Sequence, residues 1–181
     1  MSHSSRFTRV LALAIAGASP MTAALAQAPQ NAERCPATLP APVAATAEAL
    51  RAAARANDYA ALRRLVKRPV DFAWGYGGEG DPTPEWQRAK REGHDPAAML
   101  LALLAMPCIV QRTDGRIHYH WPAATNFAWS ALTPAERAPL EKLYGSAIDK
   151  AWQGGRSGGY YAGWRTTILS DGTWTAFMMP Q

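Results

Sequence analysis

The sequence predicts an α+β fold, in which several helices pack against an antiparallel sheet. Asp114-Gly115 and Asp171-Gly172 each stand between runs of alternating apolar and polar residues, which is typical of β-hairpins. A capping residue followed by proline marks three helix starts, at Thr83-Pro84, Asp95-Pro96 and Thr133-Pro134. Together with one earlier strand, these signals predict a sheet of two hairpins plus that strand.

Residues 1–26 have the features of a secretory signal peptide. Arg6 and Arg9 form a basic region, Val10–Ala18 is apolar, and Ala24-Leu25-Ala26 matches the small-x-small cleavage pattern. The apolar run is too short to cross a bilayer, so no membrane span is expected after cleavage. We therefore expect a periplasmic or secreted protein.

The rest of the chain divides by composition into two parts. Residues 27–42 are rich in Ala, Pro and Gln, which predicts an extended linker. Residues 43–181 have the size of one domain with its own core, and we expect a single α+β domain there.

The charge balance does not favour a nucleic-acid partner. The full chain has 19 Lys+Arg and 14 Asp+Glu, a net charge of +5, and the signal segment supplies two of the positive charges. The remaining basic residues are scattered, apart from four at the end of one predicted helix: Arg63, Arg64, Lys67 and Arg68. Because cations suit a helix C-terminus, we expect a solvated helix end there and no nucleic-acid binding.

Cys35 and Cys108 are the only cysteines. In an oxidising compartment two cysteines most simply form one disulfide. It would close a loop of about 72 residues, for which the chain-entropy model gives about 4 kcal/mol of stabilisation. Neither a CxxC motif nor a Cys/His group accompanies them, so the disulfide is expected to be structural.

The helical segments are predicted from capping residues and apolar spacing. Residues 43–57 are strong helix formers, and Asp58 can cap a second helix, Tyr59–Lys67. Val70–Tyr76 alternates as a strand does. The three capped starts open helices over the ranges 84–93, 97–106 and 134–152.

The polarity of the two faces supports the predicted pairing of the first hairpin. With a two-residue loop at Asp114-Gly115, Thr113 lies opposite Arg116 and Val110 lies opposite Tyr119. One face then carries Cys108, Val110, Ile117, Tyr119 and Trp121, and the other carries Gln111, His118 and His120. This is the inside/outside division of a half-buried hairpin.

The second hairpin carries large apolar residues on both faces. With a two-residue loop at Asp171-Gly172, Leu169 lies opposite Trp174 and Thr166 lies opposite Phe177. We therefore expect a hairpin that is central in the sheet or covered on both sides.

His118 and His120 are the metal-ligand candidates, because alternate strand positions put two imidazoles on one face. A metal site needs a third ligand, and the remaining histidine after the signal peptide, His94, lies on a predicted loop. We expect the pair to be surface polar residues, with no metal or other cofactor.

The glycine-rich segment from Trp74 to Pro82 is the candidate binding region. It lacks the Lys-Ser/Thr of a phosphate loop and the alternating carboxylates of a calcium loop. Its aromatic and acidic residues are predicted to form a rim that binds a peptide, protein or glycan of the cell envelope: Trp74, Tyr76, Glu79, Asp81 and Trp86.

The stretch Ala52–Val66 followed by Asp71-Phe72 resembles the opening of NTF2-like (SnoaL-type) domains. Gly163-Trp164-Arg165 with Asp171-Gly172-Thr173-Trp174 is similar to a hairpin of uncharacterised secreted proteobacterial proteins. The resemblance implies a cone-shaped pocket with acid/base residues. The predicted helix at 134–152, between the hairpins, departs from the NTF2-like order, and no catalytic position is carried over.

We expect a non-enzymatic exported binding or envelope-maintenance protein that engages its ligand through the glycine-rich segment. The alternative is a small NTF2-like enzyme with Asp71, Tyr119 or His118 as acid or base. A third possibility is a structural partner in a complex, which would expose a large apolar patch. The oligomeric state is left open.

Overall fold

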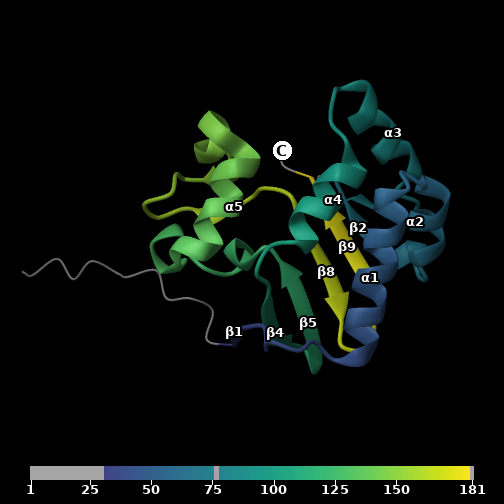
Figure 1. Ribbon diagram of the computed structural model, residues 1–181, viewed down its shortest axis with the longest axis horizontal. Coiled ribbons are helices and arrows are strands. Elements are labelled where there is room, and N and C mark those ends of the chain that lie inside the picture. Colours follow the sequence, from purple (N-terminus) through teal and green to yellow (C-terminus); the bar gives the residue numbers. More distant parts are fainter. Residues whose placement is uncertain (1–30, 76–77, 180–181) are drawn as a thin grey trace, which may run out of the picture.

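The computed structural model describes residues 31–75 and 78–179. The predicted signal peptide and residues 27–30 lie outside the described residues. The predicted α+β class is confirmed, with helices packed on a mostly antiparallel sheet (Figure 1). In the described part of the chain, every helix falls short of the length and apolarity that a bilayer span requires.

The α-helices begin where capping chemistry satisfies their free N–H groups. Asp58 accepts a hydrogen bond from the Ala61 N–H, and Asp95 accepts from the first turn of its own helix. Thr133 and Glu136 form a reciprocal capping box. The α-helices are α1 (Ala41–Arg55), α2 (Tyr59–Leu65), α3 (Thr83–Arg91), α4 (Pro96–Leu104) and α5 (Pro134–Tyr144). The 3-10 helices are η1 (Pro69–Asp71), η2 (Ala123–Thr125), η3 (Trp129–Ala131) and η4 (Gly145–Ala151).

The main sheet has the strand order β1-β4-β5-β8-β9-β2-β3. Its strands are β1 (Ala32–Arg34), β2 (Ala73–Trp74), β3 (Gly78–Glu79), β4 (Ile109–Thr113), β5 (Arg116–Trp121), β8 (Arg165–Leu169) and β9 (Trp174–Met178). A separate two-stranded ladder joins β6 (Trp152–Gln153) and β7 (Tyr160–Tyr161).

The predicted strand over residues 70–76 is shorter than expected. Pro69 starts the 3-10 turn η1, because proline suits a first helical turn and cannot donate to a strand ladder. Only Ala73 and Trp74 remain as β2, and they pair in parallel with β9. The sheet is therefore not purely antiparallel.

The predicted linker is partly structured. Ala32–Arg34 pairs with β4 as an edge strand, and α1 begins at Ala41, inside the predicted linker range. Pro42 falls in the first turn of α1, a position where its missing N–H costs nothing.

The two hairpins differ in their turns. Thr113 lies opposite Arg116 across Asp114-Gly115, and Val110 lies opposite Tyr119. In the second hairpin the Leu169 N–H donates to the Thr173 carbonyl, which makes the loop one residue longer than predicted.

A β-bulge in the second hairpin corrects the predicted face of Trp174. The register shift between Thr167 and Ile168 places Trp174 opposite Ile168 instead of Leu169, while Thr166 still lies opposite Phe177. Trp174 therefore joins the buried face, where its indole N–H donates to Thr166 at 2.8 Å. A one-residue slip moves a side chain to the opposite face of a sheet.

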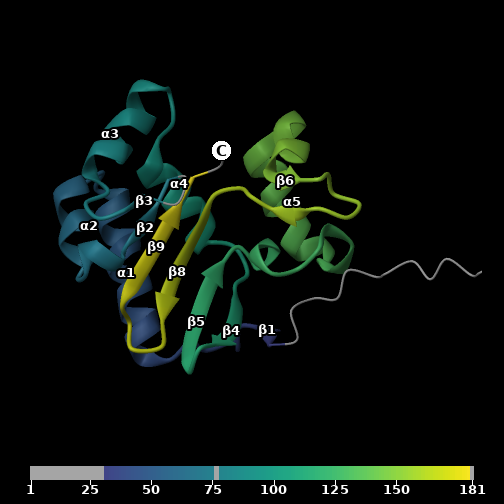
Figure 2. The same ribbon diagram turned by 180° about the vertical axis from the view of Figure 1, so that it is seen from behind.

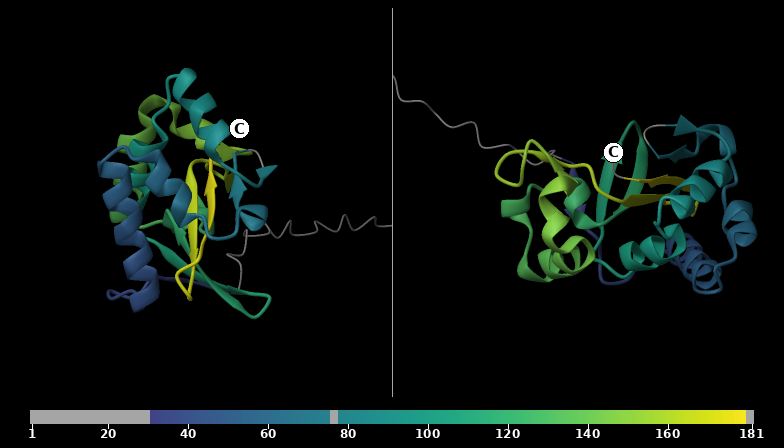
Figure 3. Two further views of the ribbon diagram at one scale, coloured as in Figure 1. Left: turned by 90° about the vertical axis from the view of Figure 1, so that its right-hand side faces the viewer. Right: turned by 90° about the horizontal axis from the view of Figure 1, so that it is seen from above.

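The core lies between one face of the sheet and helices α1 and α4 (Figure 3). Leu50 of α1, Leu100 of α4 and Ile168 of β8 are fully buried there. Trp174 packs edge-on against Phe72 and stacks on Trp86. From behind, β5, β8 and β9 face the viewer, and none of the described helices lies over them (Figure 2).

A second group of elements, made of α5, η4, β6 and β7, lies beside the sheet (Figure 1). An ion pair holds this group to the edge strand. The Glu136 carboxylate is 5 % exposed and accepts from the Arg34 guanidinium at 2.7 Å. It also accepts from the backbone and hydroxyl of Thr133. Burial alone would raise the pKa of Glu136, but the hydrogen bonds from Arg34 and Thr133 hold it below its ordinary value.

Replacing Arg34 with methionine is expected to lower the free energy of unfolding by about 1–2 kcal/mol at pH 7, because a buried carboxylate loses its cation. The loss should shrink as the pH falls through the depressed pKa of Glu136, where the carboxyl becomes neutral in both states. Urea unfolding of both proteins between pH 3 and pH 7 measures this difference.

Arg55→Met is the matched control. Its partner Glu48 is exposed, so the change should cost clearly less stability than Arg34→Met at neutral pH. Equal losses for Arg34→Met and Arg55→Met would contradict the assigned role of Glu136.

Candidate functional site

The predicted glycine-rich rim lies only partly within the described residues. Tyr76 lies outside the described residues, and Glu79 is described only by its place in β3. Trp86 is corrected to the core: it is 2 % exposed, because α3 turns it inward onto Trp174. Trp74 is half-buried, and its indole N–H has no hydrogen-bond partner among the described residues.

Asp81 has a local structural role. It accepts hydrogen bonds from the backbone and hydroxyl of Thr83, where α3 begins, and from the Arg63 guanidinium. These bonds, led by those from Thr83, lower the pKa of Asp81 below its ordinary value. Its carboxylate is therefore already engaged.

The side of the sheet opposite α1 and α4, called the open face below, is mostly polar, although its residues around His120 are buried. Strand registers place its residues in neighbouring rows: His118 lies opposite Leu169, and His120 lies opposite Thr167. The open face is formed by Ile109, Gln111, Thr113, Arg116, His118, His120, Arg165, Thr167, Leu169, Ala176 and Met178, of which Ile109 and Thr167 are buried.

A pocket of about 560 Å³ lies at the hairpin end of the open face. This hairpin pocket is bounded by η1 on one side and by the loops of both hairpins on the other. Six of its lining residues supply most of its chemistry: Arg68, Asp71, Arg116, His118, Leu169 and Thr175. Arg68 and Asp71 pair with each other at 2.5 Å, whereas Arg116 has no carboxylate within 4 Å among the described residues.

The two imidazoles of the open face lie parallel, with ring centroids 5.7 Å apart. Burial, with added repulsion from Arg116, lowers the pKa of His118 despite the nearby Asp114. Burial, with added repulsion from His118 and Arg165, lowers the pKa of His120 to about 4. Both rings are therefore uncharged at neutral pH.

His120 differs from the prediction of a solvated surface residue. Its Nδ1 lies 2.8 Å from the Thr167 hydroxyl, and its Nε2 is buried with no partner among the described residues. The described residues contain no group of three or more His, Cys, Asp or Glu arranged for a metal ion. The pair therefore has no third ligand from this part of the chain.

Arg165 is a member of the open face that the sequence analysis did not single out. Its side chain is half-buried and donates to the Gly163 carbonyl at 3.3 Å, and no described carboxylate lies within 4 Å of it. Burial lowers the pKa of Arg165 below its ordinary value, although the group stays charged. Alternation along β8 was the available signal, because it places Arg165 on the same face as Thr167.

A closed ring of hydrogen bonds lies beside Arg165. The Trp164 N–H donates to the Tyr144 hydroxyl, Tyr144 pairs with Tyr161, and Tyr161 donates to the Trp164 carbonyl. Burial raises the pKa of both phenols. Since both hydroxyls are fully engaged, the ring is a structural link between α5, β7 and the start of β8.

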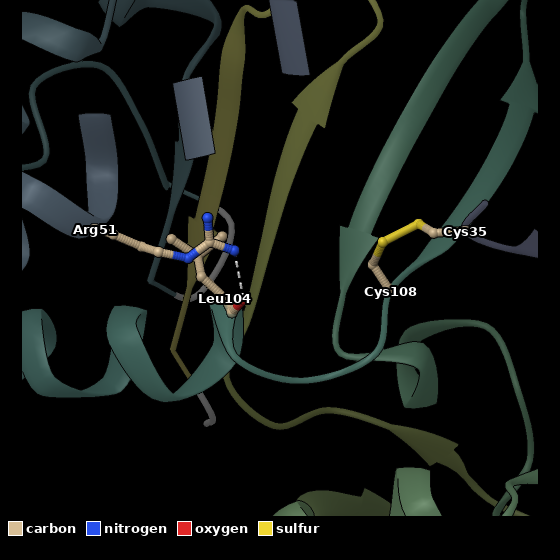
Figure 4. The surroundings of a disulfide bond; sticks show 4 residues. All are labelled: Cys35, Arg51, Leu104 and Cys108. Carbon is tan, nitrogen blue, oxygen red and sulfur yellow. Dashed lines mark hydrogen bonds between the residues drawn. A yellow bond between two sulfur atoms is a disulfide. The ribbon is translucent and has the colours of Figure 1, made fainter. Parts of the chain in front are cut away.

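The predicted disulfide between Cys35 and Cys108 is present, with Cα atoms 5.4 Å apart (Figure 4). It continues the β1–β4 ladder, since the Cys35 N–H donates to the Cys108 carbonyl. A groove of about 370 Å³ borders it. Nearby, Arg51 of α1 donates to the Leu104 carbonyl at the end of α4 (Figure 4).

The three acid/base candidates are not brought together. Asp71 and His118 line the hairpin pocket, but Tyr119 lies on the opposite face and is 6 % exposed. Val70 and Tyr160 are the exposed large apolar side chains among the described residues, and they stand singly. A broad apolar interface is therefore not visible in this part of the chain.

Comparisons with protein families, with characterised proteins and with solved structures found no match to this chain.

Proposed function

We propose that this protein is an exported, non-enzymatic binding protein that holds an acidic segment of another exported protein on its open face. The observation that carries the proposal is the mostly polar open face with the hairpin pocket at one end. A mostly polar face that carries Arg116 and Arg165 and has a pocket at one end suits a charged ligand better than a second apolar layer.

Charge supports an acidic ligand. Arg116 and Arg165 carry positive charges that no described carboxylate neutralises. Of the acids that line the hairpin pocket, Asp71 pairs with Arg68, whereas Asp171 accepts from the Thr173 backbone N–H and keeps its negative charge. Threonine hydroxyls and neutral imidazoles on the same face add hydrogen-bonding groups for a polypeptide.

Periplasmic or secreted localisation is part of this proposal. The disulfide-bonded cysteine pair is compatible with an oxidising compartment. The signal-peptide pattern before residue 27 supports the same compartment.

Reversing the charge at Arg116 should weaken binding of a glutamate-rich peptide by about thirtyfold. At contact distance in water an ion pair contributes about 1 kcal/mol, and reversal replaces this attraction by repulsion. Isothermal titration calorimetry with an acetylated, amidated hexaglutamate peptide at two salt concentrations measures the effect. Affinity should fall at the higher salt.

Arg91→Glu is the matched control, since it makes the same charge change at an exposed position of α3. It should reduce affinity by less than about twofold, because Arg91 is not part of the open face. No binding of the acidic peptide, or equal losses for the two variants, would overturn the proposal. Equal affinity for a hexalysine peptide would do the same.

A further inference from the structure

We propose that Arg165 and His120 form a carboxylate-binding subsite on the open face, which fixes one acidic side chain of the ligand. This inference rests on the proposed function and names the chemistry of its most specific contact. It is carried by two groups that are costly to leave unpaired and that lie together.

The strand register brings the two groups together. His120 lies opposite Thr167, and Arg165 is two residues from Thr167 on the same strand. Residues at such diagonal positions on one face lie within reach of long side chains. The nearby charge of Arg165 also disfavours protonation of His120.

Each group has nitrogen atoms that no described residue engages. The Arg165 side chain is half-buried, yet among the described residues its guanidinium donates only to the Gly163 carbonyl. When the Thr167 hydroxyl donates to Nδ1 of His120, the proton of the neutral ring sits on Nε2, the buried atom with no partner. A buried donor without an acceptor is unfavourable. Because Nε2 is inaccessible to solvent in this structure, an incoming oxygen would satisfy it only after the side chains around it move.

The charge of the pair selects a carboxylate. A guanidinium presents two parallel N–H groups to a carboxylate, and the imidazole adds a third donor. With His120 neutral, the site carries one positive charge, which one monovalent anion balances. A phosphate dianion would leave an excess negative charge in a partly buried place.

Among the described residues, the other groups near the pair do not supply a competing anion. His118 stacks on His120, and Tyr144, Tyr160 and Tyr161 lie near Arg165. His118, Tyr144 and Tyr161 are neutral at pH 7, since burial raises the pKa of Tyr144 and Tyr161 and lowers that of His118. Tyr160 donates its hydroxyl proton to Gln153.

The test follows the imidazole signals of His120 by NMR while sodium acetate replaces sodium chloride at constant ionic strength. Acetate should shift the His120 signals in the wild type and in Arg91→Gln, and should not do so in Arg165→Gln. Inorganic phosphate should bind more weakly than acetate. Arg165→Lys keeps the charge but loses the two parallel N–H groups of the guanidinium, so it should give an intermediate response. It also controls for a folding defect in Arg165→Gln.

Peptide titrations separate this inference from the proposed function. Arg165→Gln should weaken the hexaglutamate peptide about tenfold or more, since bonds to charged groups are strong. Normal peptide affinity in Arg165→Gln, with loss in Arg116→Glu, overturns the subsite and leaves the proposed function standing. Acetate binding that depends on Arg165, without peptide binding, supports the subsite and overturns the proposed ligand.

Two further peptides identify the source of the carboxylate. One carries a single glutamate and an amidated C-terminus, and the other has glutamine and a free C-terminus. Arg165-dependent binding of either one supports the subsite, and the better binder shows whether a side chain or a chain end occupies it. Failure of both, together with no acetate response at His120, overturns the inference.

Discussion

Reduction of the Cys35–Cys108 disulfide is expected to lower the free energy of unfolding by about 4 kcal/mol. The crosslink joins residues 73 positions apart, so its loss frees a long loop in the unfolded chain. It also ties the edge strand β1 to β4, next to Ile109 at the end of that strand. Urea unfolding of residues 27–181 with and without reductant measures the change.

The double variant Cys35→Ser/Cys108→Ser provides the control for this measurement. It should have the stability of the reduced wild type, and adding reductant should not change it further. A loss of less than about 1 kcal/mol on reduction would contradict the assigned role of the disulfide.

Replacing Gly163 with alanine is expected to lower the free energy of unfolding by about 3 kcal/mol. A Cβ atom at Gly163 would lie 2.5 Å from the Tyr161 ring and closer still to the Tyr144 hydroxyl. The buried ring of hydrogen bonds would have to open, which adds unsatisfied polar groups to the cost of overpacking. Thermal unfolding followed by near-ultraviolet circular dichroism of the tyrosines measures the effect.

Gly158→Ala is the matched control, because a Cβ atom there meets no atom within 4 Å. It should change stability by less than about 0.5 kcal/mol. If both alanine variants are equally stable, the hydrogen-bonded ring does not hold α5 to the sheet.

Local signals predicted most of the secondary structure. Capping residues such as Asp58, Asp95 and Thr133 act within one helical turn, so their helices begin where the sequence indicates. The disulfide needed only two cysteines and an oxidising compartment. The α+β class followed from these signals together with the two Asp-Gly turns.

Features that depend on tertiary packing were not predicted. A single extra loop residue and a bulge moved Trp174 to the buried face, and neither is readable from alternation alone. The parallel pairing of β2 with β9 is a long-range contact with no local signal. The pairing of β1 with β4 likewise gave the end of the predicted linker a structural role.

The candidate site was also predicted only in part, because it depends on tertiary packing. Trp86 and Asp81 suited a binding rim by composition, but packing on Trp174 and the bond to Thr83 gave them structural roles. Arg165 was not predicted as a binding residue, because that role depends on which groups lie opposite it in the sheet. That His118 and His120 share a face was predictable, whereas the enclosure of His120 required the register with β8.

The most direct test of the open face as the binding surface is a chemical-shift map of the ¹⁵N-labelled protein with the hexaglutamate peptide. We expect the largest backbone shifts along one side of the sheet, at Arg116, His118, Thr167 and Leu169, with little change in the helices that cover the other side. A footprint centred on α1 and α4, on the groove beside the disulfide, or on no surface at all would contradict the account.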